Sequence, residues 1–347
     1  MQIASDRKAW GDIAKGVGIL AIVTSHVVVH DKTLPSDTYK MVMGLVNMPT
    51  FFVLSGTMFR PAEMGSFFAR RVRSIAVPYF AFLLLVTLLV AARDVVLPNP
   101  SMPHLWQFLW GGEELKGDFG TFWFLSALFF TQLLYNLVAS RHPDPTGLPL
   151  VLLASGILLG GTALDQLAKG WALPWSLHLL PYTVPLFWFG HLLQREQQHR
   201  TLIYAGLAAI GVATLVALSQ GFHFWIAMKG RQIEPPVIGL LVGFVTAKLA
   251  ISIYRLTAVV PGISHALGFA GKRSLVILCL HQFVHFSLRR VGVETTWILI
   301  LFAFSLPALS VIFFERFAWS RAIFLGRTKP RRNVEAATGP AIPVAAA

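Results

Sequence analysis

The stretch DIAKGVGILAIVTSHVVVH, residues 12–30, decides the class of fold. It is nearly as long as the stretch of about 20 mostly apolar residues that an α-helix needs to cross the hydrocarbon core of a membrane. Similar runs recur along the chain and predict ten spans, at residues 13–30, 42–59, 75–92, 122–139, 148–167, 178–193, 202–219, 237–254, 274–291 and 296–314. A β-barrel would instead show short segments of alternating polarity. The sequence therefore predicts an all-α, polytopic integral membrane protein, a bundle of about ten transmembrane helices.

The composition and the charge distribution agree with this prediction. Of the 347 residues, 55% are hydrophobic and 13% are charged, whereas soluble proteins carry about 25% charged residues. With the N-terminus in the cytoplasm, 18 of the 29 Lys and Arg residues fall on the cytoplasmic side and 9 on the other. Because positive loops stay inside, the net charge of +13 needs no nucleic acid to explain it. We expect a protein of the bacterial inner membrane, in contact with lipid, with both termini in the cytoplasm.

The apolar runs also indicate how the chain is organised. Residues 1–325 contain all ten predicted spans and are expected to form one transmembrane domain, with no soluble domain attached. Residues 326–347 are basic and then rich in Ala, Pro and Gly, a composition typical of a disordered end. We expect this cytoplasmic tail to carry no catalytic residue.

Ionisable residues interrupt one face of the first span. Asp12 stands at its start, Lys15 lies inside it, and His26 follows eleven residues after Lys15. Eleven residues make about three helical turns and about 16 Å, so Lys15 and His26 share a face at different depths. Such a cluster can simply hold a bundle together, but ionisable groups within a membrane usually mark a pathway or a catalytic site. We interpret this face as functional.

A glycine pattern in the same span has a different explanation. Residues 16–21, GVGILA, match the pattern of dinucleotide-binding loops. No strand precedes them and no β-α-β unit surrounds them, so we reject that interpretation. Small residues in a membrane helix let a neighbouring helix approach closely or leave room for a slim ligand.

A basic segment links the second and third spans. Residues 61–74 combine two phenylalanines with Arg70, Arg71 and Arg73, a pattern typical of a short helix on the membrane surface. Such helices usually bind lipid headgroups. Arg70 and Arg73 are three residues apart, so they are neighbours on one helical face, a geometry that also suits a phosphate. The residues alone leave both interpretations open.

Other polar residues within the spans complete the candidate set. Asn47 precedes Pro49, and a proline here should interrupt the helix and free backbone groups, which membrane proteins tolerate where such groups line a cavity. Ser55 follows in the same span, Trp123 opens the fourth span and His281 lies in the ninth. For His281, a histidine satisfied within the core is an equally good interpretation.

Five segments together resemble the membrane-bound acyltransferase 3 family, and most of all its fucose 4-O-acetylase-like branch. They are DIAKGVGILAIVTSH at 12–26, FFVLSG at 51–56, RRVRSIAVPY at 70–79, WFLSALF at 123–129 and LH at 280–281. The resemblance implies an O-acetyltransferase that uses cytoplasmic acetyl-CoA. Its acceptor would be a hydroxyl of a cell-surface or exopolysaccharide sugar, or of the lipid-linked precursor of that sugar. We expect no metal ion.

The resemblance also implies catalytic roles. The histidine in the first helix of the family corresponds to His26, and the basic residue eleven positions earlier corresponds to Lys15. We expect His26 to act as general base toward the sugar hydroxyl. Asp12 would assist catalysis from the cytoplasmic end by orienting Lys15. Family members commonly carry a histidine where this chain has Asn47, and asparagine cannot relay a proton.

The basic segment acquires a role in the same way. The RxxR pair of the family corresponds to Arg70 and Arg73. Together with Lys15 and the adjacent Arg71, these residues would bind the phosphates of acetyl-CoA, because a guanidinium group forms strong charge-assisted hydrogen bonds with phosphate.

Several alternatives stay open on the residues alone. The acetyl group can pass directly to the sugar or through an acetyl-histidine. The acceptor or the oxyanion can be bound by Asn47, Ser55, Trp123, His281 or backbone freed near Pro49. A secondary transporter or exporter of a lipid-linked sugar would also show ten spans with buried ionisable residues, although the matched helix breaks typical of such proteins are not visible. The acceptor sugar and the oligomeric state are not predicted.

Overall fold

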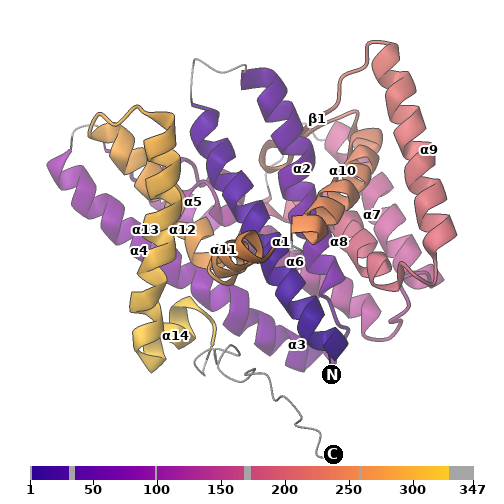
Figure 1. The fold of residues 1–347 in the computed structure, drawn as a ribbon, viewed down its shortest axis with the longest axis horizontal. Coiled ribbons are helices and arrows are strands. Elements are labelled where there is room, and N and C mark those ends of the chain that lie inside the picture. The colour runs from indigo at the N-terminus through magenta and orange to yellow at the C-terminus, as the bar shows by residue number, and fades with distance from the viewer. Residues whose placement is uncertain (1, 31–35, 98–99, 168–172, 258–259, 328–347) are drawn as a thin grey trace, which may run out of the picture.

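A computed structural model of the chain describes residues 2–30, 36–97, 100–167, 173–257 and 260–327 (Figure 1). Of the predicted tail, residues 326–347, only Gly326 and Arg327 lie within the described residues. Arg327 lies 3.9 Å from a carboxylate oxygen of Glu315 in α13, so this first part of the predicted tail packs against the bundle. Within this part of the chain the α-helices are α1 (Gln2–Val28), α2 (Ser36–Thr57), α3 (Met64–Arg71), α4 (Val77–Val96), α5 (Leu105–Trp110), α6 (Phe122–Ala139), α7 (Leu148–Leu167), α8 (Leu180–Leu192), α9 (Arg200–Ser219), α10 (Pro236–Thr257), α11 (Pro261–Lys272), α12 (Ser274–Arg290), α13 (Thr296–Arg316) and α14 (Ala318–Phe324).

Shorter elements connect the helices. A π-helical turn, η1 (Val72–Ala76), joins α3 to α4, and a two-stranded antiparallel hairpin is formed by β1 (Trp225–Ala227) and β2 (Gln232–Glu234). The remaining turns are short 3₁₀ helices, namely η2 (Gly112–Glu114), η3 (Gly117–Phe119), η4 (Pro174–Leu179), η5 (Leu193–Arg195) and η6 (Met228–Gly230).

The prediction of an all-α membrane bundle is confirmed, whereas the count of ten spans is not. Every predicted span overlaps a helix. Seven helical segments of the described chain are long and apolar enough to cross a membrane, or eight if the bent pair α11 and α12 forms one span. The two remaining predicted spans correspond to helices with shorter apolar segments: the apolar part of α2 is Met41–Thr57, and α8 has 13 residues. A straight span needs about 20 residues.

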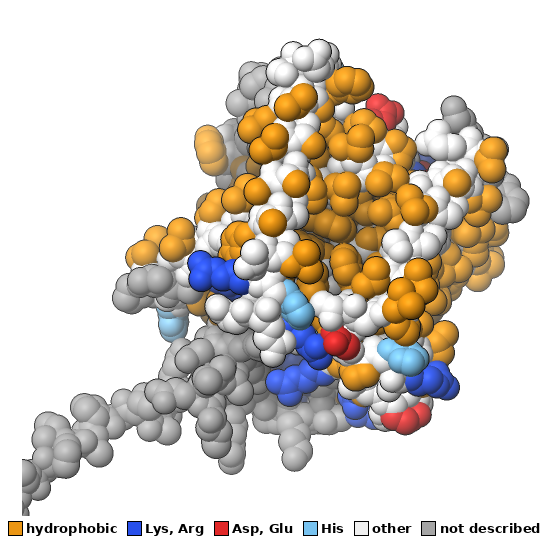
Figure 2. Space-filling model, turned by 90° about the vertical axis from the view of Figure 1, so that its right-hand side faces the viewer, with side chains coloured by type: hydrophobic (Ala, Val, Ile, Leu, Met, Phe, Trp, Pro, Cys, Tyr) orange, Lys and Arg blue, Asp and Glu red, His pale blue; other side chains and the backbone are white. Residues whose placement is uncertain are grey.

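The outer surface fits a lipid environment. Hydrophobic side chains cover most of the face shown in Figure 2, and charged side chains gather toward its lower part. Helix α9 lies at one edge of the bundle in Figure 1, and only 6% of its apolar window is buried. A helix so apolar and so little covered by protein is suited to contact with lipid chains.

Helix α1 lies near the centre of the bundle and packs against α2, α11, α12 and α13 (Figure 1). A Cβ atom at Gly16 would overlap the carbonyl oxygen of Leu267 in α11, and one at Gly271 would overlap the carbonyl oxygen of Asp12. The backbones of α1 and α11 therefore touch, which confirms the close helix approach predicted at Gly16. The sequence did not predict α11, because its 12 residues are too few for a span.

Helix α2 continues through Pro49, contrary to the predicted interruption. Proline lacks an N–H group, so the carbonyl oxygen four residues earlier, on Leu45, loses its helical donor. The hydroxyl of Thr246 in α10 supplies a hydrogen bond to Leu45 O at 2.6 Å. A neighbouring helix thus satisfies the freed backbone group, and this carbonyl, as an acceptor, offers nothing to an oxyanion.

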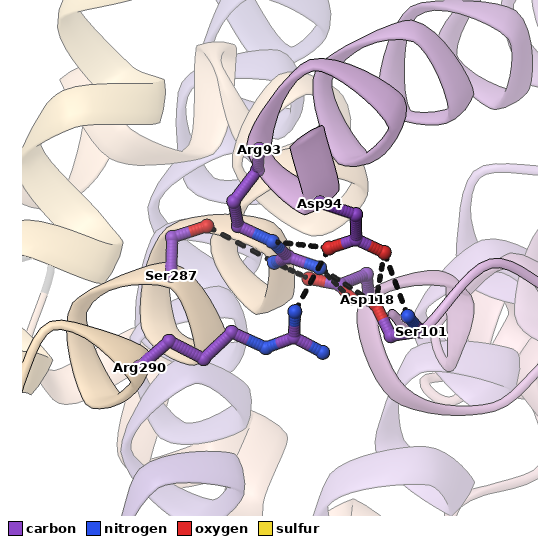
Figure 3. Close-up of polar contacts among 6 residues, drawn as sticks. All are labelled: Arg93, Asp94, Ser101, Asp118, Ser287 and Arg290. Atoms are coloured by element: carbon purple, nitrogen blue, oxygen red, sulfur yellow. Dashed lines mark hydrogen bonds and ion pairs between the residues drawn. The ribbon is translucent and has the colours of Figure 1, made fainter. Parts of the chain in front are cut away.

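A buried ionic cluster ties the end of α4 to the loop that follows it and to the end of α12 (Figure 3). The guanidinium group of Arg93 binds both carboxylate oxygens of Asp118 in η3, at 2.7 and 2.9 Å. Asp94 accepts hydrogen bonds from Arg93 at 3.1 Å and from Arg290 in α12 at 2.8 Å. The side chains of Arg93 and Asp118 are only 6% and 2% exposed. The cluster therefore fixes the loop around η3 against the bundle.

We expect Arg93→Met to lower the free energy of unfolding by about 3–5 kcal/mol, because the substitution leaves the buried carboxylate of Asp118 without its partner. The measurement is unfolding by SDS titration in mixed micelles. Arg195→Met is the control, since it breaks an exposed ion pair with Asp144 and should cost less than about 1 kcal/mol. Equal losses in the two variants would contradict the role of the buried cluster.

Candidate functional site

Two cavities lie toward opposite ends of the bundle, and α1 lines both. The first, called the basic cavity, has a volume of about 590 Å³. Its polar lining includes Asp12, Lys15, Ser55, Arg71, Lys272 and Arg327. The second, called the histidine cavity, has a volume of about 510 Å³. Its polar lining includes His26, Asn47, Lys116, Trp123, Lys229 and Gln282. The predicted functional face of α1 therefore reaches two separate chambers.

The basic cavity brings together two of the predicted residues from α1. Lys15 Nζ lies 3.6 Å from Asp12 Oδ1. The side chain of Asp12 is 9% exposed and that of Lys15 is 33% exposed. The buried carboxylate thus holds the ammonium group at the wall of the cavity, in the arrangement expected if Asp12 orients Lys15.

The three candidate arginines lie in different places. Arg71 lines the basic cavity, whereas Arg70 and Arg73 are exposed and do not line it. The reason is local: α3 ends at Arg71 and the chain continues into the wider π-helical turn η1, so the spacing of an α-helical face no longer applies. The structure therefore brings the middle arginine, rather than the RxxR pair, into the lining of the cavity that Lys15 also lines.

Three buried polar atoms of side chains that line the basic cavity lack a hydrogen-bond partner within the described residues. They are Nε of Arg71, Oγ of Ser74 and Oε1 of Gln132. A buried polar atom without a partner is costly, and such groups in native proteins usually bind a ligand, a water molecule or an ion. The two that can donate, on Arg71 and Ser74, are suited to the oxygens of a phosphate group, whereas the amide oxygen of Gln132 can only accept.

The histidine cavity is built around a pair of imidazoles. His26 Nδ1 of α1 lies 2.8 Å from His281 Nε2 of α12, and the two rings are parallel to within 4°. His281 Nδ1 lies 2.9 Å from the carbonyl oxygen of Ile277 and 3.0 Å from that of Leu278. A carbonyl oxygen can only accept, so Nδ1 of His281 carries a proton, and in the neutral imidazole its Nε2 is then an acceptor.

This order of donors fixes the tautomer of His26. Because His281 Nε2 accepts, His26 carries its proton on Nδ1 and donates it to His281. The lone pair of His26 is then on Nε2, which has no hydrogen-bond partner in the described part of the chain. His281 is fully buried and His26 lines the cavity. His281 therefore lies within the core with its hydrogen bonds satisfied, as one of the two interpretations predicted, and one of its partners is the candidate base His26.

Gln282 adds an amide to the same group. Its Nε2 lies 3.3 Å from His26 Nδ1, and its buried Oε1 has no partner among the described residues. Turning the amide by 180° would let Oε1 accept from the Nδ1–H of His26 and would leave the NH₂ group toward Gly120. Gln282 is therefore a polar group of the site that the sequence did not identify.

Asn47 presents an acceptor to the histidine cavity. The hydroxyl of Ser25 donates to the carbonyl oxygens of Ala21 and Ile22, so its oxygen accepts from Asn47 Nδ2 at 3.0 Å. This bond orients the amide and leaves Oδ1 of Asn47 buried without a partner among the described residues. An acceptor in this position suits a ligand hydroxyl better than an oxyanion.

The remaining acceptor and oxyanion candidates divide between the cavities. Trp123 lines the histidine cavity, as its predicted role requires. Ser55 lines the basic cavity instead, and its hydroxyl donates to Phe51 O at 2.8 Å. The structure therefore does not bring Ser55 to His26.

The hairpin and the loop after α4 complete the wall of the histidine cavity with residues that the sequence did not single out. Trp225 of β1, Lys229 of η6 and Lys116 all line it. Lys229 Nζ donates to the carbonyl oxygens of Leu115 and Gly120. Burial lowers the pKa of Lys229 to about 8, so its ammonium group loses charge under mildly alkaline conditions. The rim of this cavity thus combines cations with aromatic rings.

The comparison with known families agrees with the resemblance found in the sequence. The sequence model of the acyltransferase 3 family, described as an acyltransferase domain, matches residues 8–315. The match includes both cavities except Arg327. The chain belongs to this family and is a membrane acyltransferase. No match was found among curated proteins or among solved structures.

The tautomer of His26 can be tested directly. In protein labelled with ¹⁵N-histidine, we expect His26 to carry its proton on Nδ1, and His281→Phe should produce a mixture of tautomers because the acceptor is lost. The signal is assigned by its absence in His26→Ala. His265→Phe, an exposed position on α11, is the control and should change nothing. A wild-type His26 protonated on Nε2 would contradict the hydrogen-bond order.

Proposed function

We propose that this acyltransferase moves an acetyl group from cytoplasmic acetyl-CoA to a hydroxyl of a cell-surface or exopolysaccharide sugar, or of its lipid-linked precursor, as the fucose 4-O-acetylase-like branch of the family would. One observation carries the proposal. A single helix, α1, presents Lys15 to a basic cavity and His26 to a second cavity that contains an unpartnered acceptor and aromatic rings.

The basic cavity is the donor site in this proposal. Its cations Lys15 and Arg71 contact the diphosphate of acetyl-CoA, using the guanidinium donor that lacks a protein partner. Arg70 and Arg73, exposed beside the cavity, contact the outer phosphate of the nucleotide. The positive-inside distribution supports a cytoplasmic location of this end.

The histidine cavity is the acceptor site. Trp123 and Trp225 offer aromatic faces on which a sugar ring can stack. Oδ1 of Asn47 accepts a hydrogen bond from a hydroxyl of the sugar and helps to position it. Lys116 and Lys229 at the rim favour an acceptor with negative charge nearby, such as an acidic sugar or a diphosphate-linked one.

The reaction is acyl transfer assisted by a general base. His26 Nε2 takes the proton as the sugar oxygen attacks the thioester carbonyl, so that the C–O bond forms and the C–S bond then breaks. The hydrogen bond from Nδ1–H to His281 holds the ring of His26 in one orientation, and it stabilises the imidazolium that forms because a charged donor strengthens the bond. The NH₂ group of Gln282 is the proposed donor to the oxyanion. The proton that Nε2 has accepted finally passes to the sulfur of CoA.

The first test compares the wild type with His26→Ala in a bacterial host that makes a defined surface glycan. We expect acetyl mass increments on the glycan with the wild type and a loss of about 10²- to 10⁴-fold with the variant, the usual contribution of a positioned base. His265→Ala is the matched control. Equal acetylation by wild type and His26→Ala, or none by either, would remove the assignment.

A second test concerns the donor site. Arg71→Met should raise the KM for acetyl-CoA at least about tenfold with little change in kcat, because the lost hydrogen bonds to phosphate serve binding alone. Arg70→Met and Arg73→Met should have smaller effects that vanish at high salt, since exposed charges are screened. Arg141→Met, another exposed arginine, is the control. A larger effect at Arg70 or Arg73 than at Arg71 would contradict this placement.

A further inference from the structure

Three side chains line both cavities and therefore lie between them. They are Ile22 of α1, Phe124 of α6 and Leu278 of α12. Each is almost fully buried, with exposed fractions of 2%, 6% and 7%. All three are apolar, so a group passing between the cavities can be selected here only by its size and shape and not by hydrogen bonds.

These side chains are held in fixed positions relative to the imidazole pair. Ile22 precedes His26 by about one turn of α1. The carbonyl oxygen of Leu278 accepts hydrogen bonds from the Thr121 hydroxyl at 2.9 Å and from His281 Nδ1 at 3.0 Å. The turn of α12 that carries Leu278 is thus tied to α6 and to the partner of His26.

The third side chain is wedged between aromatic rings. The ring of Phe124 packs edge-to-face against Phe51 at 5.8 Å and Phe52 at 5.2 Å between centroids. Such contacts favour one orientation of the ring. These side chains form a partition, and an aperture through a partition made of a fixed ring and two branched aliphatic side chains opens only at a cost in packing.

We propose that Ile22, Phe124 and Leu278 form an acyl filter that admits the acetyl thioester from the basic cavity to His26 and excludes longer acyl groups. The inference rests on the proposed function, since it presumes that a thioester enters through the basic cavity. It adds the residues that determine how long an acyl chain the enzyme accepts from its donor. The transfer itself is unchanged, with the acyl carbon leaving sulfur for the sugar oxygen and the hydroxyl proton passing through His26 to the thiolate.

The experiment measures which acyl group reaches the acceptor. Purified protein is given equal concentrations of acetyl-CoA, butanoyl-CoA and hexanoyl-CoA, together with the unmodified form of the glycan that the wild type was found to acetylate. The amount of each acylated product is measured by mass spectrometry. The variants are Phe124→Ala and Leu278→Ala, with Phe124→Leu and Leu278→Val as milder versions should the first pair fail to fold. Phe122→Ala is the control, because this buried phenylalanine of α6 lines neither cavity.

We expect the wild type to transfer almost only acetyl. Enlarging the aperture should raise the ratio of butanoyl to acetyl product at least about tenfold, the discrimination that a single methylene typically gives in an apolar site. The control should keep the wild-type ratio. Three results would overturn the filter: efficient transfer of hexanoyl by the wild type, unchanged ratios in folded variants, or an equal change in Phe122→Ala.

Failure of the filter is separable from failure of the proposed function. If wild-type acetylation depends on His26 but the ratios do not respond to the aperture variants, the filter is wrong and the acetyltransferase assignment remains. If the wild type transfers no acyl group of any length, or if His26→Ala transfers as much, the function is wrong and the filter is overturned with it.

Discussion

The hydrogen bond from His26 to His281 is the interaction on which the site depends. An imidazole within a membrane needs a partner for each polar atom that does not face a cavity. The backbone carbonyls of Ile277 and Leu278 fix the proton of His281, and His281 then fixes the proton of His26. The backbone of α12 thereby determines, through the side chain of His281, which ring nitrogen of His26 carries the lone pair that can accept a proton. Without His281, the proton of His26 would have no fixed position, whereas the tautomer of His281 is set by the backbone of its own helix.

This hydrogen bond requires that α1 and α12 stay in register, and the packing around them maintains it. Gly16 and Gly271 allow α1 and α11 to touch, and α11 leads directly into α12 through a bend of 78°. At the other end, the ion pair between Arg93 and Asp118 holds the loop that carries Lys116 against α12. The two cavities are therefore bounded by elements that cannot easily move apart.

The sequence predicted the helical bundle and the common face of α1 on which Lys15 and His26 lie, because hydropathy and helical spacing are local properties. It named Arg70, Arg71 and Arg73 as candidates for phosphate binding, and of these three only Arg71 lines the basic cavity. It missed Gln282 and Lys229, because their roles come from contacts between segments far apart in the chain. Helical spacing predicts which residues share a face only where the helix is regular, and η1 is not. The sequence of one span also does not show which hairpin or loop will cover the cavity beside it.

The proposed division of labour between the cavities follows from the cost of charge in a membrane. The phosphates of CoA carry several negative charges, and moving them through hydrocarbon is far more costly than moving a neutral acetyl group. Cations at one end can hold the charged part of the donor while its neutral arm extends along α1. A polar channel wide enough for the whole donor would also admit water and ions. The filter proposed at Ile22, Phe124 and Leu278 would let the acyl group pass while the membrane barrier is preserved, so selection by acyl size and the sealing of the bilayer would have the same physical origin.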